Sequence, residues 1–230
     1  MAESLGFTFE LTDFSGEAPI FPLPDVVFFP KTLLPLHIFE PRYRQMIRDV
    51  LAGERLVAIT LLQEGWEHHQ EQESPFHSIG TLAYIEEVEP LEDGKSNILL
   101  NGLVKVHITE LPKTAPYRHG AMRIIQDTAE RWQINQERER LLQRFRRIAE
   151  LVRENFPIRD IEQADMSLET LVNLMATWLP IPLNEKQKLL EIDNIVLRSE
   201  IVREFLRQEM DDLSLLNTLH LPTPDNPHWN

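Results

Sequence analysis

Cysteine is absent from the 230-residue sequence, and this absence removes several kinds of chemistry at once. Disulfide bonds, thiol nucleophiles and cysteine–zinc sites all depend on it. Long apolar runs are missing too, since no segment approaches the run of about 18 apolar residues that a membrane span needs. The N-terminus, MAESLGFTFELTDFSGE, lacks the basic start and the apolar stretch of a signal peptide. We therefore expect a cytoplasmic protein that has no membrane partner.

Basic residues are also fewer than acidic residues along the whole chain. There are 23 lysine and arginine residues against 37 aspartate and glutamate residues, which gives a net charge of −14. Both halves share the excess: residues 1–125 hold 10 basic and 18 acidic side chains (net −8), and the remainder holds 13 and 19 (net −6). Because such a chain repels polyanions, nucleic acid is not expected as a partner.

The sequence contains none of the common nucleotide-binding or catalytic motifs. G-x-x-x-x-G-K-[ST], G-x-G-x-x-G, G-x-S-x-G and H-E-x-x-H are missing, and 8 glycines leave little material for a phosphate-binding loop. The tightest acidic cluster is Glu86, Glu87 and Glu89, but strand alternation directs Glu87 and Glu89 to solvent. Carboxylates that act as acid and base need a cleft that raises a pKa. We expect no catalytic residue and no cofactor.

Histidines gather in one acidic loop, residues 63–77. His68, His69 and His77 lie there among four glutamates, and imidazole and carboxylate groups are suitable zinc or nickel ligands. Their spacing matches no helix or hairpin geometry, and closing a loop around an ion costs entropy. We expect a solvated loop without a metal, and a bound ion is the alternative that the sequence leaves open.

Residues 1–125 have the frequent proline and glycine breaks of a sheet-rich domain. Strands are predicted within residues 19–30, 32–39, 56–62, 78–88, 92–111 and 119–127, with a turn at Asp93–Gly94. The prolines of residues 19–30 suit an edge strand more than a central one. In residues 104–109, Val104, Val106 and Ile108 alternate with Lys105, His107 and Thr109, which predicts that this second set faces away from the core.

One helix is predicted inside this half, at the stretch PLHIFEPRYRQMI. Proline is favoured at a first helical position, so the helix should begin at Pro41, and Gly53 should end it. The predicted buried stripe is Tyr43, Ile47, Val50 and Leu51. His37, Glu40 and Arg42 fall at the strand–helix junction, where a local ion pair is the simplest interpretation.

Residues 126–230 show helical periodicity with few breakers, which predicts a helical bundle after the β-rich part. Ser167 is a predicted N-cap, and Asn184 with Gln187 resembles a capping box. The predicted inward faces are Leu141, Phe145, Ile148 and Val152; Leu168, Leu171, Met175 and Trp178; and Leu197, Ile201, Phe205 and Leu206. The arginines of residues 138–153 alternate with glutamates, which is typical of a solvated helix face. The predicted domains are residues 1–125 and 126–230.

Several of these stretches, in this order, carry a family pattern. FPLPDVVFFPKTLLPLHIFEPRYRQMI, LVAITLL and IGTLAYIEEVEPLEDGKSNILLNGLVKVHI together resemble the N-terminal, substrate-binding domain of Lon ATP-dependent proteases. LPIPLNEKQKLLEIDNIVLRSEIVREFL resembles the helical segment that follows this domain. The resemblance implies an α+β fold, with a PUA-like β-barrel or folded sheet and a C-terminal α-helical bundle. It covers roughly residues 20–215, without the ATPase and serine–lysine protease modules, so we expect a stand-alone, non-enzymatic bacterial relative.

The resemblance implies binding of unfolded or damaged polypeptides, with a role as an adaptor or regulator of proteolysis and a protease or chaperone as a further partner. Such a role needs exposed apolar side chains. The candidates for peptide binding are the apolar residues without clear periodicity: Phe28, Phe29, Leu34, Leu36, Phe39 and Trp66. The alternative function is RNA binding, because PUA-like folds often bind RNA; the net charge of −14 disfavours it.

Overall fold

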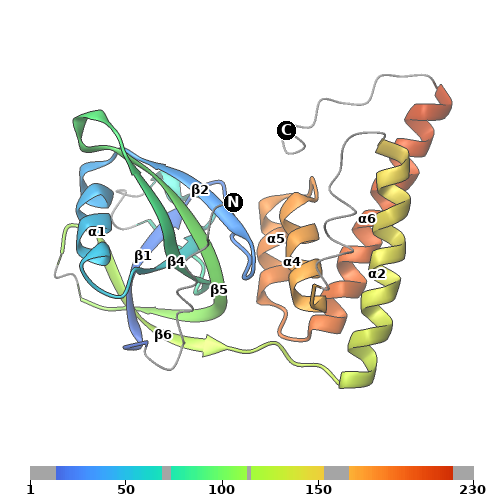
Figure 1. The fold of residues 1–230 in the computed structure, drawn as a ribbon, viewed down its shortest axis with the longest axis horizontal. Helices are drawn as coiled ribbons and strands as arrows, with labels where there is room; N and C mark the ends of the chain where they lie inside the picture. The colour runs from blue at the N-terminus through green and yellow to red at the C-terminus, as the bar shows by residue number, and fades with distance from the viewer. Residues whose placement is uncertain (1–13, 69–73, 113–114, 153–165, 220–230) are drawn as a thin grey trace, which may run out of the picture.

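The computed structural model describes residues 14–68, 74–112, 115–152 and 166–219. Figure 1 shows a β-barrel with one helix packed on it and a group of helices beside it. Within the described residues the chain forms one six-stranded mixed sheet and five α-helices. The α+β class predicted from the sequence is confirmed.

Six strands form the sheet, and five of them close into a ring. The strands are β1 (Glu17–Leu23), β2 (Leu33–Ile38), β3 (Leu56–Leu61), β4 (Ile79–Pro90), β5 (Ser96–Glu110) and β6 (Arg118–Ile125). Their order is β2-β5-β4-β3-β1-β6, and a further pairing of β5 with β6 closes the barrel. β5 allows this because it is 15 residues long: its first part pairs with β2 and its second part with β6. β2 therefore lies outside the closed ring.

β1 is a correction to the sequence prediction, which placed its prolines on an edge strand. The strand lies between β3 and β6 in the sheet. Residues 17–20 pair with β6 and residues 20–23 pair with β3, so Pro19 and Pro22 each lie on a stretch that has one strand neighbour. A missing N–H is tolerated where a strand has a neighbour on one side only.

The helix α1 (Pro41–Leu51) packs on the barrel, and Figure 1 shows it on the side away from the other helices. Pro41 lies in its first turn, as predicted, where a missing N–H costs nothing. Its buried residues are Tyr43, Met46, Ile47 and Val50, which join a barrel core cluster. Leu51, predicted on the buried stripe, is 36% exposed, and Met46 at 0% was missed.

A hairpin turn connects β4 to β5 at the predicted position. Asp93 has φ 63° and Gly94 has φ 70°, the left-handed conformation that such turns require. The guanidinium of Arg44, from α1, lies beside Gly94. The turn is therefore packed against the first helix.

The remaining helices are α2 (Arg131–Val152), α4 (Leu168–Trp178), α5 (Leu183–Glu191) and α6 (Ile195–Leu219). Ser167 caps α4 as predicted, since its Oγ accepts from Thr170 N at 3.1 Å. The cap predicted at Asn184 is wrong: the N-cap of α5 is Pro182, two residues earlier, and the helix begins at Leu183. Gln187 instead donates to the Ile79 carbonyl at 3.1 Å, a partner from β4 that local pattern cannot reveal.

The inward face of α6 also differs from the prediction. Leu197, predicted inward, is 47% exposed, whereas Arg198 at 1% and Val202 at 0% are buried. On α2, Leu141 and Phe145 are buried as predicted. The side chains of Ile148 and Val152 lie outside the described residues. Leu206, also predicted inward, is buried, and Ile201 and Phe205 pack, partly buried, on the same core, so Leu197 is the exposed member of the predicted set.

The barrel and the helices share a hydrophobic core. Val27, Phe29 and Leu61 come from the β-rich part and belong to the same buried cluster as the residues of α2, α4, α5 and α6. Phe29 is 0% exposed. β6 ends at Ile125 and α2 begins at Arg131, so the few residues between them connect two parts that already pack together.

A buried polar network reinforces this joint. Arg198 donates to both carboxylate oxygens of Asp127, at 2.7 and 2.8 Å, and to Asn173 Oδ1 at 3.0 Å. Lys105 Nζ lies 3.1 Å from Asp127 and 2.9 Å from Asp193. The sequence predicted that Lys105 faces away from the core, but it is 3% exposed. A register shift in the β4–β5 pairing at Leu82/Ala83 lies beside it, and its carboxylate partners come from distant segments.

Candidate functional site

The strand β2 and the residue that follows it expose a row of side chains on the barrel. Leu33 is 56% exposed and Phe39 is 57% exposed, which makes them two of the most exposed large apolar residues in the described part of the chain. Pro35 and His37, between them, are exposed as well. Alternate residues of a strand point to opposite faces, so Leu34 and Leu36 turn inward and pack, half-buried, on the barrel core. We call Leu33, Pro35, His37 and Phe39 the β2 edge.

The backbone of β2 has one strand neighbour among the described residues, namely β5. Gly102 of β5 donates to the Thr32 carbonyl at 3.0 Å, and hydrogen-bonding direction alternates along a strand from that point. The backbone N–H and C=O groups of Leu34 and Leu36 therefore face β5. The backbone groups of Leu33, Pro35 and His37 face outward. Pro35 has no N–H to offer there, which interrupts the ladder that an added strand would need.

A ring contact and a row of hydrogen bonds position the polar member of the β2 edge. The His37 and Phe39 rings are stacked, with centroids 6.1 Å apart and planes at 20°. His37 Nδ1 lies 2.9 Å from Asn97 Oδ1, and Asn97 Nδ2 donates to Glu89 at 2.8 Å. These residues are directly opposite one another on β2, β5 and β4. The three side chains of this row hydrogen-bond to one another and provide a polar border to the apolar residues of the β2 edge.

The junction between β2 and α1 fixes the position of Phe39. Arg42 Nη2 lies 2.8 Å from Glu40 Oε2, and the Arg42 guanidinium sits 4.5 Å from the centre of the Tyr43 ring. This is the local ion pair that the sequence predicted at the strand–helix junction. Because Tyr43 is buried, the ion pair holds the turn that contains Phe39 against the barrel.

A buried tyrosine anchors α1 from its other side. The Tyr117 hydroxyl donates to Asp49 Oδ2 at 2.9 Å. Burial, together with the hydrogen bond and the charge of Asp49, raises the pKa of Tyr117 to about 12. The phenol is therefore neutral and available as a donor over the ordinary pH range, which helps to hold the helix that follows the β2 edge.

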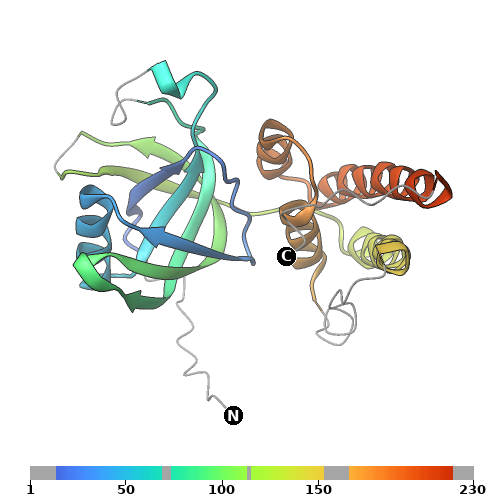
Figure 2. The ribbon, with the colours of Figure 1, turned by 90° about the horizontal axis from the view of Figure 1, so that it is seen from above.

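The predicted peptide-binding residues do not form one surface. Phe28 is 4% exposed and lies in the barrel core, while Phe29 is 0% exposed in the shared core, so neither can contact a partner. Leu34 and Leu36 are half-buried, and Phe39 is exposed. Trp66 is half-buried in the short 3-10 helix η2 (Trp66–His68), which Figure 2 shows in cyan, well away from β2.

Leu33 was missed by the sequence prediction. The available signal was the alternation of LLPLHIF, in which one set of apolar residues must face outward if the other faces the barrel. Choosing between the two sets requires the pairing of β2 with β5, because a one-residue change of register exchanges them.

The ionisable groups elsewhere in the described residues do not gather into a metal site. In residues 14–68, 74–112, 115–152 and 166–219, no three histidine, aspartate or glutamate side chains gather so as to hold a metal ion. His69 and residues 70–73 of the acidic-histidine loop lie outside the described residues, and His77 lies 3.4 Å from Glu191. Glu86, Glu87 and Glu89 are exposed. Among the described helices, none has the length and apolar character of a membrane span.

The fold and this surface define a class: an α+β protein in which a closed barrel, with an additional apolar edge strand, is joined to a helical bundle. The sequence of residues 17–208 matches the family described as "ATP-dependent protease La (LON) substrate-binding domain". This match covers most of the chain. The protein therefore belongs to the family of Lon substrate-binding domains, as the resemblance predicted.

Curated relatives point to the same family. The chain is 30% identical over 207 residues to the Lon protease of Trichlorobacter lovleyi, covering 86% of this chain and 24% of that protein. It is 28% identical over 203 residues to Lon protease 2 of Herpetosiphon aurantiacus, again covering 86% of this chain and 24% of the relative. The chain thus spans about a quarter of the length of these proteins, and the family match concerns their substrate-binding domain alone.

Solved structures show the same fold. The N-terminal domain of a Mycobacterium avium complex Lon protease superposes with a TM-score of 0.67 at 15% identity, covering 83% of this chain and 98% of that one. The Lon N-terminal domain protein from Xanthomonas campestris superposes with a TM-score of 0.60 at 19% identity, covering 81% and 96%. At these identities the likeness shows the fold, which includes both the barrel and most of the helical part.

Proposed function

We propose that this protein binds unfolded or damaged polypeptides without chemically changing them, and that the β2 edge makes the contact. The observation that carries this proposal is the pair Leu33 and Phe39, each more than half exposed, on a strand outside the closed barrel. Membership in the Lon substrate-binding domain family supports it. In this role the protein serves as a cytoplasmic adaptor or regulator that delivers or withholds clients from a protease or chaperone.

The contact is made by side chains and not by strand addition. Pro35 interrupts the outward-facing backbone of β2, so a client cannot extend the sheet continuously. Leu33 and Phe39 instead offer apolar area, and burial of apolar area contributes about 25 cal/mol per Å². Half-buried Leu34 and Leu36 lie on the strand between them and can contribute only their exposed parts.

Charge favours clients with basic residues near apolar ones. Glu89, in the hydrogen-bonded row beside His37, is exposed, and the chain as a whole carries −14. Electrostatic complementarity mainly increases the rate of encounter and adds little to affinity. Apolar side chains should therefore determine client affinity, and basic residues should determine how quickly clients are captured.

The proposal is tested by comparing two double variants, each of which replaces two exposed apolar side chains. Leu33→Ser/Phe39→Ser removes the apolar part of the β2 edge, and Trp132→Ser/Leu197→Ser removes two exposed apolar residues of α2 and α6, which are 69% and 47% exposed. Affinity is measured by fluorescence anisotropy of a labelled, permanently unfolded polypeptide, and aggregation of a client diluted out of urea is followed by light scattering. The edge variant should bind at least about tenfold more weakly, and the control should match the wild type.

Two results would contradict the proposal. In the first, the wild-type protein neither binds the unfolded polypeptide nor reduces light scattering. In the second, both double variants lose affinity equally, which would mean that any exposed apolar residue contributes and that the β2 edge is not a site. Circular dichroism of each variant checks that the fold is retained.

A further inference from the structure

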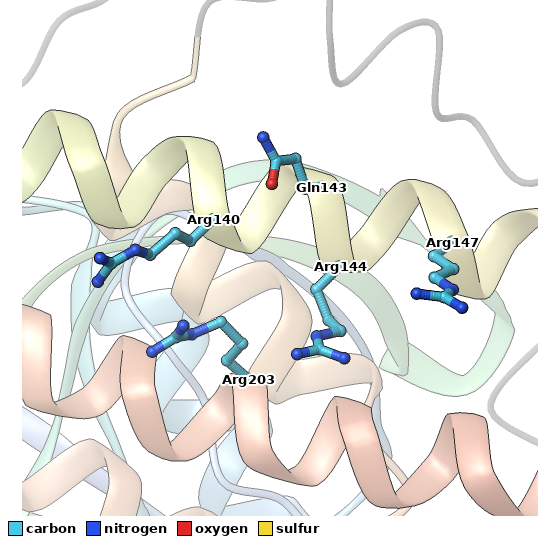
Figure 3. A pocket seen from close by; sticks show the side chains of 5 residues that line it. All are labelled: Arg140, Gln143, Arg144, Arg147 and Arg203. Carbon is cyan, nitrogen blue, oxygen red and sulfur yellow. The ribbon is translucent and has the colours of Figure 1, made fainter.

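Four arginine side chains line a cavity of about 290 Å³ beside α2 and α6. Arg140, Arg144 and Arg147 come from α2 and Arg203 comes from α6; Gln143 completes the lining. Figure 3 shows the three α2 arginines directed toward α6 and Arg203 directed back toward α2, while Gln143 points away from α6. We call this cavity the arginine groove. It belongs to the helical part, and the β2 edge contributes nothing to it.

The positive charge of the groove is only partly balanced from beneath. Glu137 is 3% exposed, and its Oε1 accepts from Arg140 Nη1 at 2.6 Å. Its Oε2 lies 3.4 Å from Arg203 Nη2, longer than a good charged hydrogen bond. One carboxylate therefore serves two arginines. Arg144 and Arg147 form no ion pair with any residue that the structure describes.

Acidic residues on the adjoining turn of α6 are already engaged. Glu204 lies 2.7 Å from Arg207, which also reaches Asp211 at 2.6 Å. The hydrogen bond from Arg207 lowers the pKa of Glu204, and the charge of Arg144 contributes less. Counting Glu137 and these neighbours gives five arginines and three carboxylates, so the described groups sum to +2 in a chain of net −14. A local positive site on a chain of this net charge attracts small anions.

The geometry identifies the class of anion. A guanidinium presents parallel N–H donors that match two oxygens of a phosphate or carboxylate. Arg144 and Arg147 are three residues apart on one helix, which separates their Cβ atoms by about 5–6 Å. That spacing suits two neighbouring phosphates, each taken by one arginine, with Arg203 opposite. Among the described residues the lining consists of arginine and glutamine side chains, so its specific contacts are hydrogen-bond donors suited to an anion.

We propose that the arginine groove binds a diphosphate group, either as free pyrophosphate or at the end of a nucleotide. The groove, with a volume of about 290 Å³, is close to the smallest size expected of a ligand pocket. It therefore receives the diphosphate and leaves the rest of a nucleotide outside. Arg144 and Arg147 bind the two phosphates, and Arg140 and Arg203, held in place by Glu137, close the two sides.

Isothermal titration of the full chain with sodium pyrophosphate at low ionic strength tests the site. The variant Arg144→Gln/Arg147→Gln removes the two arginines without ion-pair partners. The control Arg123→Gln/Arg146→Gln removes the same amount of charge from an exposed position of β6 and from the same helix α2, outside the lining. The first variant should lose at least about tenfold in affinity, and the control should stay within about twofold of wild type.

Parallel titrations distinguish the possible sources of the ligand. A nucleoside diphosphate that binds as tightly as pyrophosphate identifies the diphosphate group as the part that is recognised in both. Three results overturn the proposal: no pyrophosphate binding by the wild-type chain at about 1 mM, equal losses in the two double variants, or tighter binding of a glutamate-rich peptide than of pyrophosphate. Helical circular dichroism of each variant shows whether α2 is intact.

Discussion

The β2 edge and the arginine groove are opposite in chemistry and in origin. The edge exposes Leu33 and Phe39 and has no unpaired charge among its residues, whereas the groove is lined by four arginines and one glutamine without an apolar side chain. The edge comes from one strand, in which alternation separates an inner and an outer set of residues. The groove needs two helices that are distant in sequence. The two proposed binding surfaces thus lie on different parts of the chain, one on the barrel and one on the helices.

The largest predicted effect on stability comes from comparing two phenylalanines ten residues apart in the sequence, one in the interior and one on the surface. Phe29 is 0% exposed in the core shared by barrel and helices, and Phe39 is 57% exposed on the β2 edge. Phe29→Ala should lower the free energy of unfolding by about 3–5 kcal/mol because it leaves a cavity. Phe39→Ala should change it by less than about 0.5 kcal/mol. Urea unfolding followed by circular dichroism measures both; similar losses would mean that Phe39 belongs to the core.

Breaking the buried polar network between the barrel and the helices should have a smaller effect on the free energy of unfolding. Arg198→Met removes the donors to Asp127 and Asn173, although Lys105 still pairs with Asp127. We expect a loss of about 3 kcal/mol in unfolding free energy, at the lower end for a broken buried pair. Proteolysis should also increase between Ile125 and Arg131, where β6 continues into α2. Arg123→Met, at an exposed position, is the control. Unchanged stability of the Arg198 variant would show that the apolar core alone holds the two parts together.

The smallest of the predicted effects concerns ionic strength, which should change binding at the arginine groove but not at the β2 edge. Screening shortens the range of electrostatic attraction from about 10 Å at 0.1 M salt to about 3 Å at 1 M. Pyrophosphate affinity at the arginine groove should therefore fall by about tenfold, or about 1.4 kcal/mol, over that range. Affinity of the β2 edge for an unfolded polypeptide should be unchanged, because apolar contact is not screened. Equal salt dependence in the two titrations would contradict electrostatic binding at the arginine groove and apolar binding at the β2 edge.

Local signals in the sequence correctly predicted several features that depend on a few consecutive residues. Pro41 begins α1, Ser167 caps α4 and Asp93–Gly94 forms the turn, because each feature is determined by a few consecutive residues. The family resemblance extended this to the α+β class. The division into domains 1–125 and 126–230 stays a prediction.

Features that depend on partners far along the chain could not be predicted. Lys105 is buried because Asp127 and Asp193 meet it, and α6 turns Arg198 inward, in place of Leu197, to reach Asp127. The arginine groove was missed for the same reason. The alternating charges of α2 predicted a solvated face, and only the packing of α6 brings Arg203 opposite Arg140 and Arg144.

Under the proposed function, Pro35 has a consequence for the range of clients that the β2 edge would accept. A chain that joins a sheet must match it residue by residue, since each added N–H and C=O needs its partner, and this imposes a fixed register. The outward backbone of β2 is interrupted at Pro35, so a client on the β2 edge is held by its side chains and is free to slide. Such a surface would select clients by their amino-acid composition and not by the order of the residues in their sequence. Pro35 also hinders strand pairing between the β2 edges of two copies of this protein.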